Sequence, residues 1–397
     1  MRIVFLLPMG IERPSGRRYF QIARELVQQG NTVRLLALHP DLQTCNQRRF
    51  IQDGVEVWYV GQMHARKSTS VPSRFGAFAL LKILIGATLG MVWGIICSPA
   101  DAYHLGKPQP VNGLAAIIGV MLLRRQRFYV DCDDDEVGSN RLNGRWQRVI
   151  FRFWQWFLPR IASGVTVNTQ FQAGQLRQAS LKHIVYVPNG VDLQQTTRPP
   201  EDVMAALRHQ LGLTDGRTIA YAGTLALHNH PVDLLLAAFA ELAHTNGGIN
   251  LLLIGGGEDL PVLQREVEGL QLGDLVYFTG QVPHHRVRDY LALAVVSVDP
   301  VVDDVVARAR SPLKVFESMA LMVPVVTGDV GDRAVVLDHG HAGILVAPGD
   351  VAALAAGLQQ LLADEPLRIR LSEAAYVRVQ QYGWDRLAKQ WQTVYEN

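Results

Sequence analysis

Short apolar runs alternate with longer amphipathic stretches along this chain. In its first half, runs rich in Val, Ile, Leu and Phe predict strands at residues 3–7, 32–37, 55–60, 102–105, 128–131, 164–168 and 184–187. Residues with helical spacing of apolar positions lie between them, at 17–29, 73–96, 111–124, 145–158 and 170–179. Alternation of this kind predicts a parallel, doubly wound sheet.

The alternation stops over a polar stretch, 194–216, and then begins again. Strands are predicted at 218–222, 250–254, 276–279, 295–298, 323–327 and 344–346, with helices at 234–244, 260–270, 285–293, 351–362 and 384–395. We therefore expect an α/β protein with two doubly wound, Rossmann-like domains. The predicted domains are residues 1–192, joined by the final helix within 384–397, and residues 193–383.

Composition narrows the class of protein. Apolar residues make up 48% of the 397 positions, which is enough for two sizeable cores and argues against disorder. The net charge of +2 gives no global basic field, so nucleic acid is not an expected partner. Cys45, Cys97 and Cys132 lie far apart, without disulfide or metal-ligand spacing, which favours a reducing, cytoplasmic compartment.

Two stretches raise the question of membrane contact. Residues 83–100 carry no charge, and Gly86, Gly90 and Gly94 recur every fourth position. Predicted strands on both sides of this segment favour a buried or interfacial helix over a membrane span. In residues 145–158 and just before them, Arg141, Arg145, Arg148 and Arg152 recur at helical spacing beside an aromatic stripe. That pattern fits an in-plane helix on an anionic membrane surface, and equally a core helix with a solvated arginine face.

Ligands of doubly wound sheets bind beyond the carboxyl ends of the strands, so the loops after strands are the candidate sites. After the first strand, Gly16 and Arg17 stand at the mouth of a helix, where an anion is favoured. His104 and Lys107 fall near the end of the 102–105 strand. A run of acids follows the 128–131 strand, namely Asp131, Asp133, Asp134, Asp135 and Glu136. The run holds too many acids for a packing role and suits acceptor hydroxyls, a divalent cation, or no ligand.

The most informative stretch is SPLKVFESMALMVPVV at residues 311–326. Pro312 marks the first turn of a helix, whose free N–H groups suit a phosphate. Lys314 and Glu317 are three residues apart and share one helical face. A cation for phosphate and a carboxylate for vicinal hydroxyls, within one turn, indicate a nucleoside-diphosphate site. The alternative is a surface helix with a Lys–Glu pair.

With this motif late in a second doubly wound domain, the chain resembles the family-four glycosyltransferases of the GT-B fold. Further matches follow in the family's order: VPNGVD at 187–192, YAGTL at 221–225, LLLIGGGED at 251–259, FTGQVP at 278–283 and AGILVAPGD at 342–350. The resemblance implies transfer of a hexose from a nucleotide sugar to a saccharide or lipid-linked acceptor, with retention and without a metal or other cofactor. It also implies a place in cell-surface polysaccharide or glycolipid synthesis.

By matched position, Glu317 would hold the ribose, and the backbone of Ser311, Pro312, Leu313, Lys314 and Val315 the diphosphate. The resemblance also implies donor contacts from Gly16, Arg17, Gly223, Thr224, His230, Gly256, Gly257, Glu258, Gly280 and Val282. His104 matches a position near the transferred sugar. His104, Lys314 and Glu317 are thus the catalytic candidates, and Lys107, Asp131, Asp133 and Asp134 are acceptor-side candidates.

The chain also departs from the common family pattern. Ala309 stands where many relatives carry a glutamate, eight residues before Glu317. Thr224 and His230 stand where many carry the arginine and lysine that bind the diphosphate. We expect Lys314 to supply the missing positive charge, with Arg308 or Arg310 in reserve. Two alternatives remain: a nucleotide-sugar-binding protein that has lost its chemistry, or another GT-B enzyme such as a sugar-nucleotide epimerase.

Overall fold

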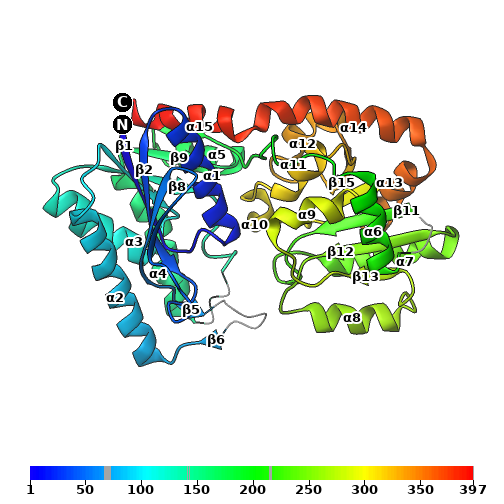
Figure 1. The fold of residues 1–397 in the computed structure, drawn as a ribbon, viewed down its shortest axis with the longest axis horizontal. Helices are drawn as coiled ribbons and strands as arrows, with labels where there is room; N and C mark the ends of the chain where they lie inside the picture. The colour runs from blue at the N-terminus through cyan, green and yellow to red at the C-terminus, as the bar shows by residue number, and fades with distance from the viewer. Residues whose placement is uncertain (67–72, 141, 143, 214–216, 397) are drawn as a thin grey trace. The chain divides into compact units, whose positions relative to one another are not determined.

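The computed structural model describes residues 1–66, 73–140, 142, 144–213 and 217–396. It divides into two compact units, one formed by Met1–Pro188 with Trp384–Asn397 and the other by Asn189–Gly383 (Figure 1). Each unit is built on a sheet with helices on both faces, and the predicted α/β, doubly wound fold class is confirmed. Residues 141, 214–216 and 397, which fall within predicted segments, lie outside the described residues.

The sheet of the N-terminal unit has the order β10-β9-β8-β7-β1-β2-β4-β3. The predicted strands are confirmed as β1 (Arg2–Leu7), β2 (Thr32–His39), β4 (Val55–Gln62), β7 (Ala102–Gly106), β8 (Phe128–Cys132), β9 (Gly164–Val167) and β10 (Ile184–Tyr186). All of them pair in parallel. The edge strand β3 (Arg49–Gln52), antiparallel to β4, was not predicted, because only Phe50 and Ile51 are apolar and Ile51 is exposed.

Helices cover both faces of this sheet. On one face lie α1 (Pro14–Gln28) and α15 (Trp384–Gln392), which pack on each other, with η4 (Thr393–Tyr395) after them. The other face carries α2 (Ala77–Ile96), α3 (Pro110–Ala115) continued by the π-helical η1 (Ala116–Leu123), and α4 (Arg145–Ile161). Helix α5 (Gln170–Gln178) connects β9 to β10. The helix predicted from residue 73 begins at Ala77, because β6 (Ser73–Arg74) pairs with β5 (Ala65–Arg66).

Helix α2 is long and apolar enough to cross a membrane by length and composition alone. One side of it packs directly on the sheet, over β2 and β4. A Cβ added at Gly90 would lie 2.1 Å from the carbonyl oxygen of Val60, and one at Gly94 would lie 2.9 Å from Leu36. Gly90 and Gly94 therefore allow α2 to lie close to the sheet, as expected of an interfacial rather than a spanning helix, whereas a Cβ on Gly86 would meet nothing within 4 Å.

The C-terminal unit has an all-parallel sheet of order β13-β12-β11-β14-β15-β16. Its strands are β11 (Arg217–Ala222), β12 (Ile249–Ile254), β13 (Val276–Phe278), β14 (Val296–Asp299), β15 (Val325–Gly328) and β16 (Ile344–Val346). Its helices are α6 (Glu201–Leu211), α7 (Val232–Thr245), α8 (Leu260–Gly269), α9 (His284–Leu291), α10 (Val305–Arg308), α11 (Leu313–Ala320), α12 (Arg333–Val336), α13 (Val351–Ala363) and α14 (Glu365–Val379). The strands lie where the apolar runs predict them.

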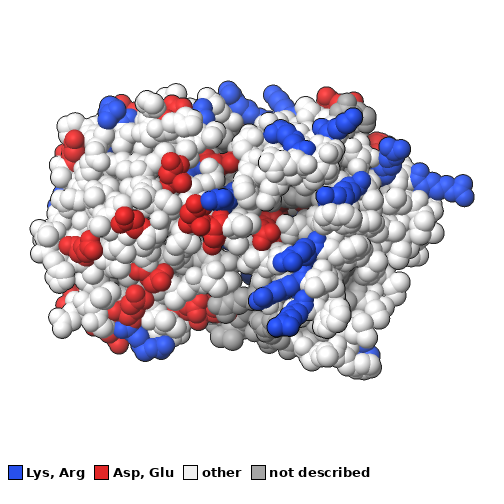
Figure 2. Space-filling view, turned by 180° about the vertical axis from the view of Figure 1, so that it is seen from behind, with Lys and Arg blue, Asp and Glu red and all other residues white. Residues whose placement is uncertain are grey.

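Charge is unevenly spread over the surface. Seen from behind, Lys and Arg side chains predominate on the N-terminal unit (at the right of the view), and Asp and Glu on the C-terminal unit (Figure 2). The near-neutral net charge of the chain therefore conceals a local basic field on one unit.

Candidate functional site

In the C-terminal unit, the loops after β11 and β12 are held together by their backbones. The N–H of Gly223 donates to the carbonyl of Ile254 at 2.9 Å, and that of Leu225 donates to Gly256 at 3.1 Å. A Cβ at Gly255 would lie 2.1 Å from the carbonyl oxygen of Gly223, and one at Gly257 would lie 2.1 Å from that of Leu225. The glycines thus let the two loops touch at the carboxyl edge of the sheet, where ligands of this fold bind.

The loop before α11 is fixed by the PNG turn. The backbone N–H of Asn189 donates to Ser311 Oγ at 3.1 Å, and Asn189 Nδ2 donates to the Ser311 carbonyl at 2.6 Å. Pro312 occupies the N-cap position, and α11 begins directly after it. The side chain of Val315 points into the core, so only its backbone belongs to the site. The segment at the N-terminus of α11 is therefore held in place by hydrogen bonds within the protein.

Lys314 lies at the carboxyl ends of β11 and β14. Its Nζ is 3.1 Å from Asp299 Oδ1 and 4.1 Å from the centroid of the Tyr221 ring. It is also 3.2 Å from where a Cβ on Gly223 would be. Arg333 Nε donates to the other oxygen of Asp299 at 2.8 Å. Burial acts to raise the pKa of Asp299, but Arg333 and Lys314 more than offset it and hold that pKa well below its usual range.

His230 and Arg310 add to this positive region. Arg310 Nη1 donates to the carbonyl of Asn229 at 2.8 Å, beside His230. Burial, with the charges of Lys314 and Arg310, holds the pKa of His230 well below its ordinary value. His230 is therefore neutral near pH 7. The positive charges of Lys314 and Arg310 lie close enough to lower its pKa. Arg308, the other reserve cation, is paired with Asp303 on the surface at 2.6 Å.

Glu317 lies one turn along α11 and faces a different neighbour from Lys314. Its Oε1 is 3.7 Å from Nε2 of His284, at the start of α9, and its side chain is 17% exposed. Gly280, which forms a backbone bridge to Gly255, and Val282, which packs against the core, belong to the loop leading into α9. The structure thus brings the predicted motifs after β11, β12 and β13 and at α11 to one edge of this sheet.

The structure shows the surroundings of two residues that depart from the family pattern, Ala309 and Thr224. Ala309 is buried, at the end of α10, with its N–H bonded to the carbonyl of Val305. Thr224 is exposed, and its carbonyl accepts from the Tyr221 hydroxyl at 3.2 Å. Asp299, Tyr221 and Arg333 were missed as site residues. Asp299 is the last residue of β14, so the rule for strand ends would have found it.

His104 lies inside the N-terminal unit. Strand β7 runs on to Gly106, which leaves the fully buried His104 in mid-strand. Its ring lies 4.6 Å from that of Trp391, and its Nδ1 is 3.0 Å from the Tyr395 hydroxyl. Burial, with the charge of Arg18, holds the pKa of His104 well below its ordinary value. The predicted strand-end position of His104 is wrong, because β7 extends two residues beyond it. A contact with the transferred sugar conflicts with its full burial, and that role stays a prediction.

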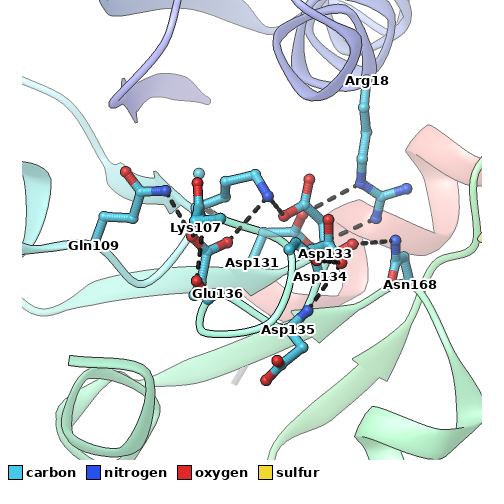
Figure 3. A network of polar contacts seen from close by, with 12 residues as sticks. Arg18, Lys107, Gln109, Asp131, Asp133, Asp134, Asp135, Glu136 and Asn168 are labelled. Atoms are coloured by element: carbon cyan, nitrogen blue, oxygen red, sulfur yellow. Dashed lines mark hydrogen bonds and ion pairs between the residues drawn. The ribbon is translucent and has the colours of Figure 1, made fainter. Parts of the chain in front are cut away.

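The acidic run after β8 forms an internal polar network (Figure 3). Lys107 Nζ lies 2.9 Å from Asp133 Oδ1 and 3.0 Å from Glu136 Oε1, and Gln109 donates to Glu136 at 2.6 Å. Burial raises the pKa of Glu136, while Lys107 acts against that shift. Lys107, Asp133 and Glu136 are all buried. The inference that the run holds too many acids for a packing role is wrong, because each buried acid has a partner within the fold.

Asp131 is buried in a second part of the network. It accepts from Arg18 Nε at 3.2 Å and from the Tyr19 hydroxyl at 3.0 Å. Arg18 also donates to the carbonyls of Val187 and Pro188, at 2.6 and 2.9 Å, where the N-terminal unit ends. An acceptor-side role for Asp131, Asp133 and Lys107 therefore conflicts with their burial. Asp134 is only partly buried, and its assignment stays a prediction.

Gly16 lies in the first turn of α1, which starts at Pro14. A Cβ on Gly16 would lie 2.0 Å from the carbonyl oxygen of Gly10, so close packing by itself explains the glycine. Arg17 follows it and is partly exposed. A role for either residue at a donor phosphate stays a prediction.

The described residues include one group with metal-ligand proximity, formed by His228, Glu258 and Asp259, whose ligand atoms lie within 4.8 Å of one another. Asp259 Oδ2 already accepts from the N–H of Leu227 at 2.8 Å. His228 and Glu258 are exposed at the surface. Their 3.7 Å contact is a polar contact at the surface, and the expected independence from metal stays a prediction.

Two family models match this chain. The model described as glycosyl transferase 4-like domain matches residues 15–190, and that described as glycosyl transferases group 1 matches residues 216–364. The matches extend over both units, and the chain belongs to the group 1, 4-like glycosyltransferase family.

Curated relatives agree with this family. A D-inositol 3-phosphate glycosyltransferase of Xylanimonas cellulosilytica is 36% identical over 230 residues, which is 56% of this chain and 53% of that protein. A phosphatidyl-myo-inositol mannosyltransferase of Mycobacterium leprae is 29% identical over 399 residues, covering 100% of this chain and 96% of the relative. The chain thus spans about half the length of the first relative, but nearly all of the second.

Solved structures show the same fold. A sucrose-phosphate synthase of Thermosynechococcus elongatus has a TM-score of 0.78 at 20% identity, covering 100% of this chain and 98% of its own. The Anabaena protein HepE, in complex with UDP and glucose, has a TM-score of 0.73 at 18% identity, covering 99% and 98%. The fold is GT-B.

Proposed function

We propose that this protein transfers a hexose from a nucleoside-diphosphate sugar to a saccharide or lipid-linked acceptor, with retention of configuration at the anomeric carbon. The observation that carries the proposal is that Lys314 and Glu317, both on α11, face different neighbours. Lys314 points to the ends of β11 and β14, while Glu317, one turn later, faces the start of α9. A cation and a carboxylate held apart in this way match a diphosphate and a ribose.

In this proposal the diphosphate lies at the N-terminus of α11. The N–H groups of Leu313 and Lys314 stand in the first turn of the helix, and anions are favoured there. Lys314 adds a full charge, and Arg310 stands nearby, beside His230. Glu317 would bind the ribose hydroxyls, Gly280 and Val282 would border the base, and the Gly256–Glu258 loop would line the same edge.

Catalysis would rest on charge stabilisation and positioning. The bond between the anomeric carbon and the diphosphate oxygen breaks, and the acceptor oxygen forms a new bond on the same face of the sugar. The acceptor proton passes to the departing diphosphate oxygen, so no protein base is required. Lys314 and Arg310 would stabilise the negative charge that develops on the leaving group, without a metal ion.

The relatives support an acceptor rich in hydroxyl groups. One relative is named for D-inositol 3-phosphate and the other for phosphatidyl-myo-inositol. Among the proteins of similar fold, HepE binds UDP and UDP-glucose, and the glycosyltransferase WaaG is involved in lipopolysaccharide biosynthesis. We therefore propose a role in glycolipid or cell-surface polysaccharide synthesis, with UDP-sugars as the first donors to test. The cytoplasmic location expected from the free cysteines stays a prediction.

The test is calorimetric binding across UDP-, GDP-, dTDP- and ADP-sugars, repeated with Glu317→Ala. Selective binding that the variant loses is the expected result, followed by product formation with inositol phosphates or glycolipid acceptors. Proton NMR of the product would then show whether configuration is retained. If the folded wild-type chain bound none of the donors, the proposal would be refuted.

A second candidate is a nucleotide-sugar-binding protein without transferase chemistry. It is favoured by two uncharged residues, Ala309 and Thr224, at positions where many relatives carry a glutamate and an arginine. Ala309 is buried and Thr224 is exposed and neutral. Selective donor binding with no turnover of any acceptor would support this candidate. Conversion of the donor without an acceptor would instead indicate an epimerase.

A further inference from the structure

Helices α2, α3 with η1, and α4 lie side by side on one face of the N-terminal sheet. Glycines allow this close packing. A Cβ on Gly119 of η1 would lie 2.8 Å from Ile95 of α2, and one on Gly113 of α3 would lie 2.7 Å from Trp154 of α4. The four segments therefore form one continuous layer, which we call the helix layer.

The outer side of the helix layer is apolar. On α2 the exposed large side chains recur every three or four residues, as one helical face: Phe78, Leu81, Ile85, Leu89, Trp93 and Ile96. Large apolar side chains are also exposed on α3 and η1, namely Leu114, Ile118, Met121, Leu122 and Leu123, and on α4, namely Trp146, Val149, Ile150, Phe153 and Trp156. Phe78 is 72% exposed and Trp146 81%. Soluble proteins rarely expose a contiguous apolar surface of this kind unless it binds something.

The charges of the helix layer are all of one sign. The sequences of α2, α3, η1 and α4 contain no Asp or Glu within these described elements. Arg145, Arg148 and Arg152 are exposed on α4, interleaved with its outward aromatic residues, and Lys82 is exposed on α2. Arg141 of the predicted basic stripe lies outside the described residues. Apolar side chains flanked by arginine and tryptophan suit a boundary between a hydrocarbon phase and a layer of anionic groups.

We infer that the helix layer is a docking face for an anionic lipid bilayer, with α2, η1 and α4 lying in the plane of the membrane interface. Two observations favour this occupant over a second copy of the chain. The charge on the layer is uniformly positive, so two copies would bring like charges together. The exposed arginines of α4 also lie among exposed aromatic residues such as Trp146 and Phe153, a combination typical of helices that lie in a membrane interface. This inference is independent of the proposed transfer reaction.

The experiment is sedimentation of the full chain with sucrose-loaded vesicles, made either of phosphatidylcholine or of equal parts phosphatidylglycerol and phosphatidylcholine. We expect binding to the anionic vesicles and little binding to the neutral ones, because each basic residue near an anionic surface contributes about 1 kcal/mol. The triple variant Arg145→Gln, Arg148→Gln, Arg152→Gln should therefore bind on the order of 100-fold more weakly.

A second pair of variants tests the apolar part. Leu89→Glu combined with Trp146→Glu places charges on α2 and α4, and should abolish binding to anionic vesicles. Ile51→Glu is the matched control, because Ile51 is 73% exposed on β3, outside the helix layer, and its replacement should leave binding unchanged. Thermal unfolding checks that each variant is folded, since all three positions are exposed.

Two results would overturn the inference. One is binding to anionic vesicles that the arginine variant and the Leu89/Trp146 variant leave intact. The other is no binding to either vesicle, together with a dimer in light scattering that the Leu89/Trp146 variant dissociates. In that case the helix layer is an interface between copies of the chain.

Discussion

Replacement of Lys314 by alanine tests the reasoning about the donor site most directly. In the structure Lys314 is largely buried and lies 3.1 Å from Asp299, which keeps its second partner, Arg333, at 2.8 Å. The variant should fold, because Asp299 retains that guanidinium. An ionic hydrogen bond to the donor diphosphate would be lost, at about 1.5–3 kcal/mol. The expected loss of donor affinity is therefore about tenfold to 150-fold.

The affinity is measured by calorimetry with the donor that binds best to the wild-type chain. Arg208→Ala is the matched control, because Arg208 carries the same charge but pairs with Glu201 at the surface of α6. In the Lys314→Ala background, Asp299→Asn should restore part of the affinity, because it removes a carboxylate that would otherwise repel the diphosphate. Donor affinity within about twofold of the wild type, less than 1 kcal/mol, would refute the role of Lys314.

Three further predictions concern single residues. Glu317→Gln should narrow the preference for a ribonucleotide donor over its 2′-deoxy analogue, measured by calorimetry; an unchanged preference would contradict the ribose assignment. Because the pKa of His230 is held below its unfolded value, the unfolded chain binds the extra proton, so stability should fall as the pH drops below about 6.5. His230→Gln should make unfolding temperature less dependent on pH in that range, and an unchanged dependence would argue against a neutral His230. His104→Ala should destabilise the N-terminal unit by about 3 kcal/mol yet leave donor affinity unchanged, and a folded variant with weaker donor binding would reopen a site role.

Much of the fold follows from local patterning. The strands of both sheets lie in runs of β-branched and aliphatic residues, and strand–helix alternation dictates parallel pairing. Helix α14 escaped prediction because its apolar positions form no clear stripe, although Asp364 caps it by accepting from the N–H of Leu367 at 2.8 Å. Strand β3 escaped prediction because it is a short, exposed edge strand.

The candidate site was only partly predictable. The spacing of Lys314 and Glu317 predicts that they are neighbours one helical turn apart. It does not predict that Lys314 contacts Asp299 while Glu317 lies beside His284. The partners Asp299 and Tyr221 lie on other strands, and only the order of the sheet brings them to Lys314. In the same way, the sequence shows the apolar stretch of α2 but not which of its faces packs on β4.

The environments of His104 and of the acidic run after β8 could not be predicted from the sequence. The sequence by itself determined the fold class and the motif at α11, since both depend on periodicity along one segment. Only the tertiary structure decided that His104 packs against Trp391, and that Lys107 contacts both Asp133 and Glu136. Whether a polar residue faces a ligand or a partner inside the fold depends on residues distant in the chain. Burial and pairing are therefore set by packing rather than by local sequence.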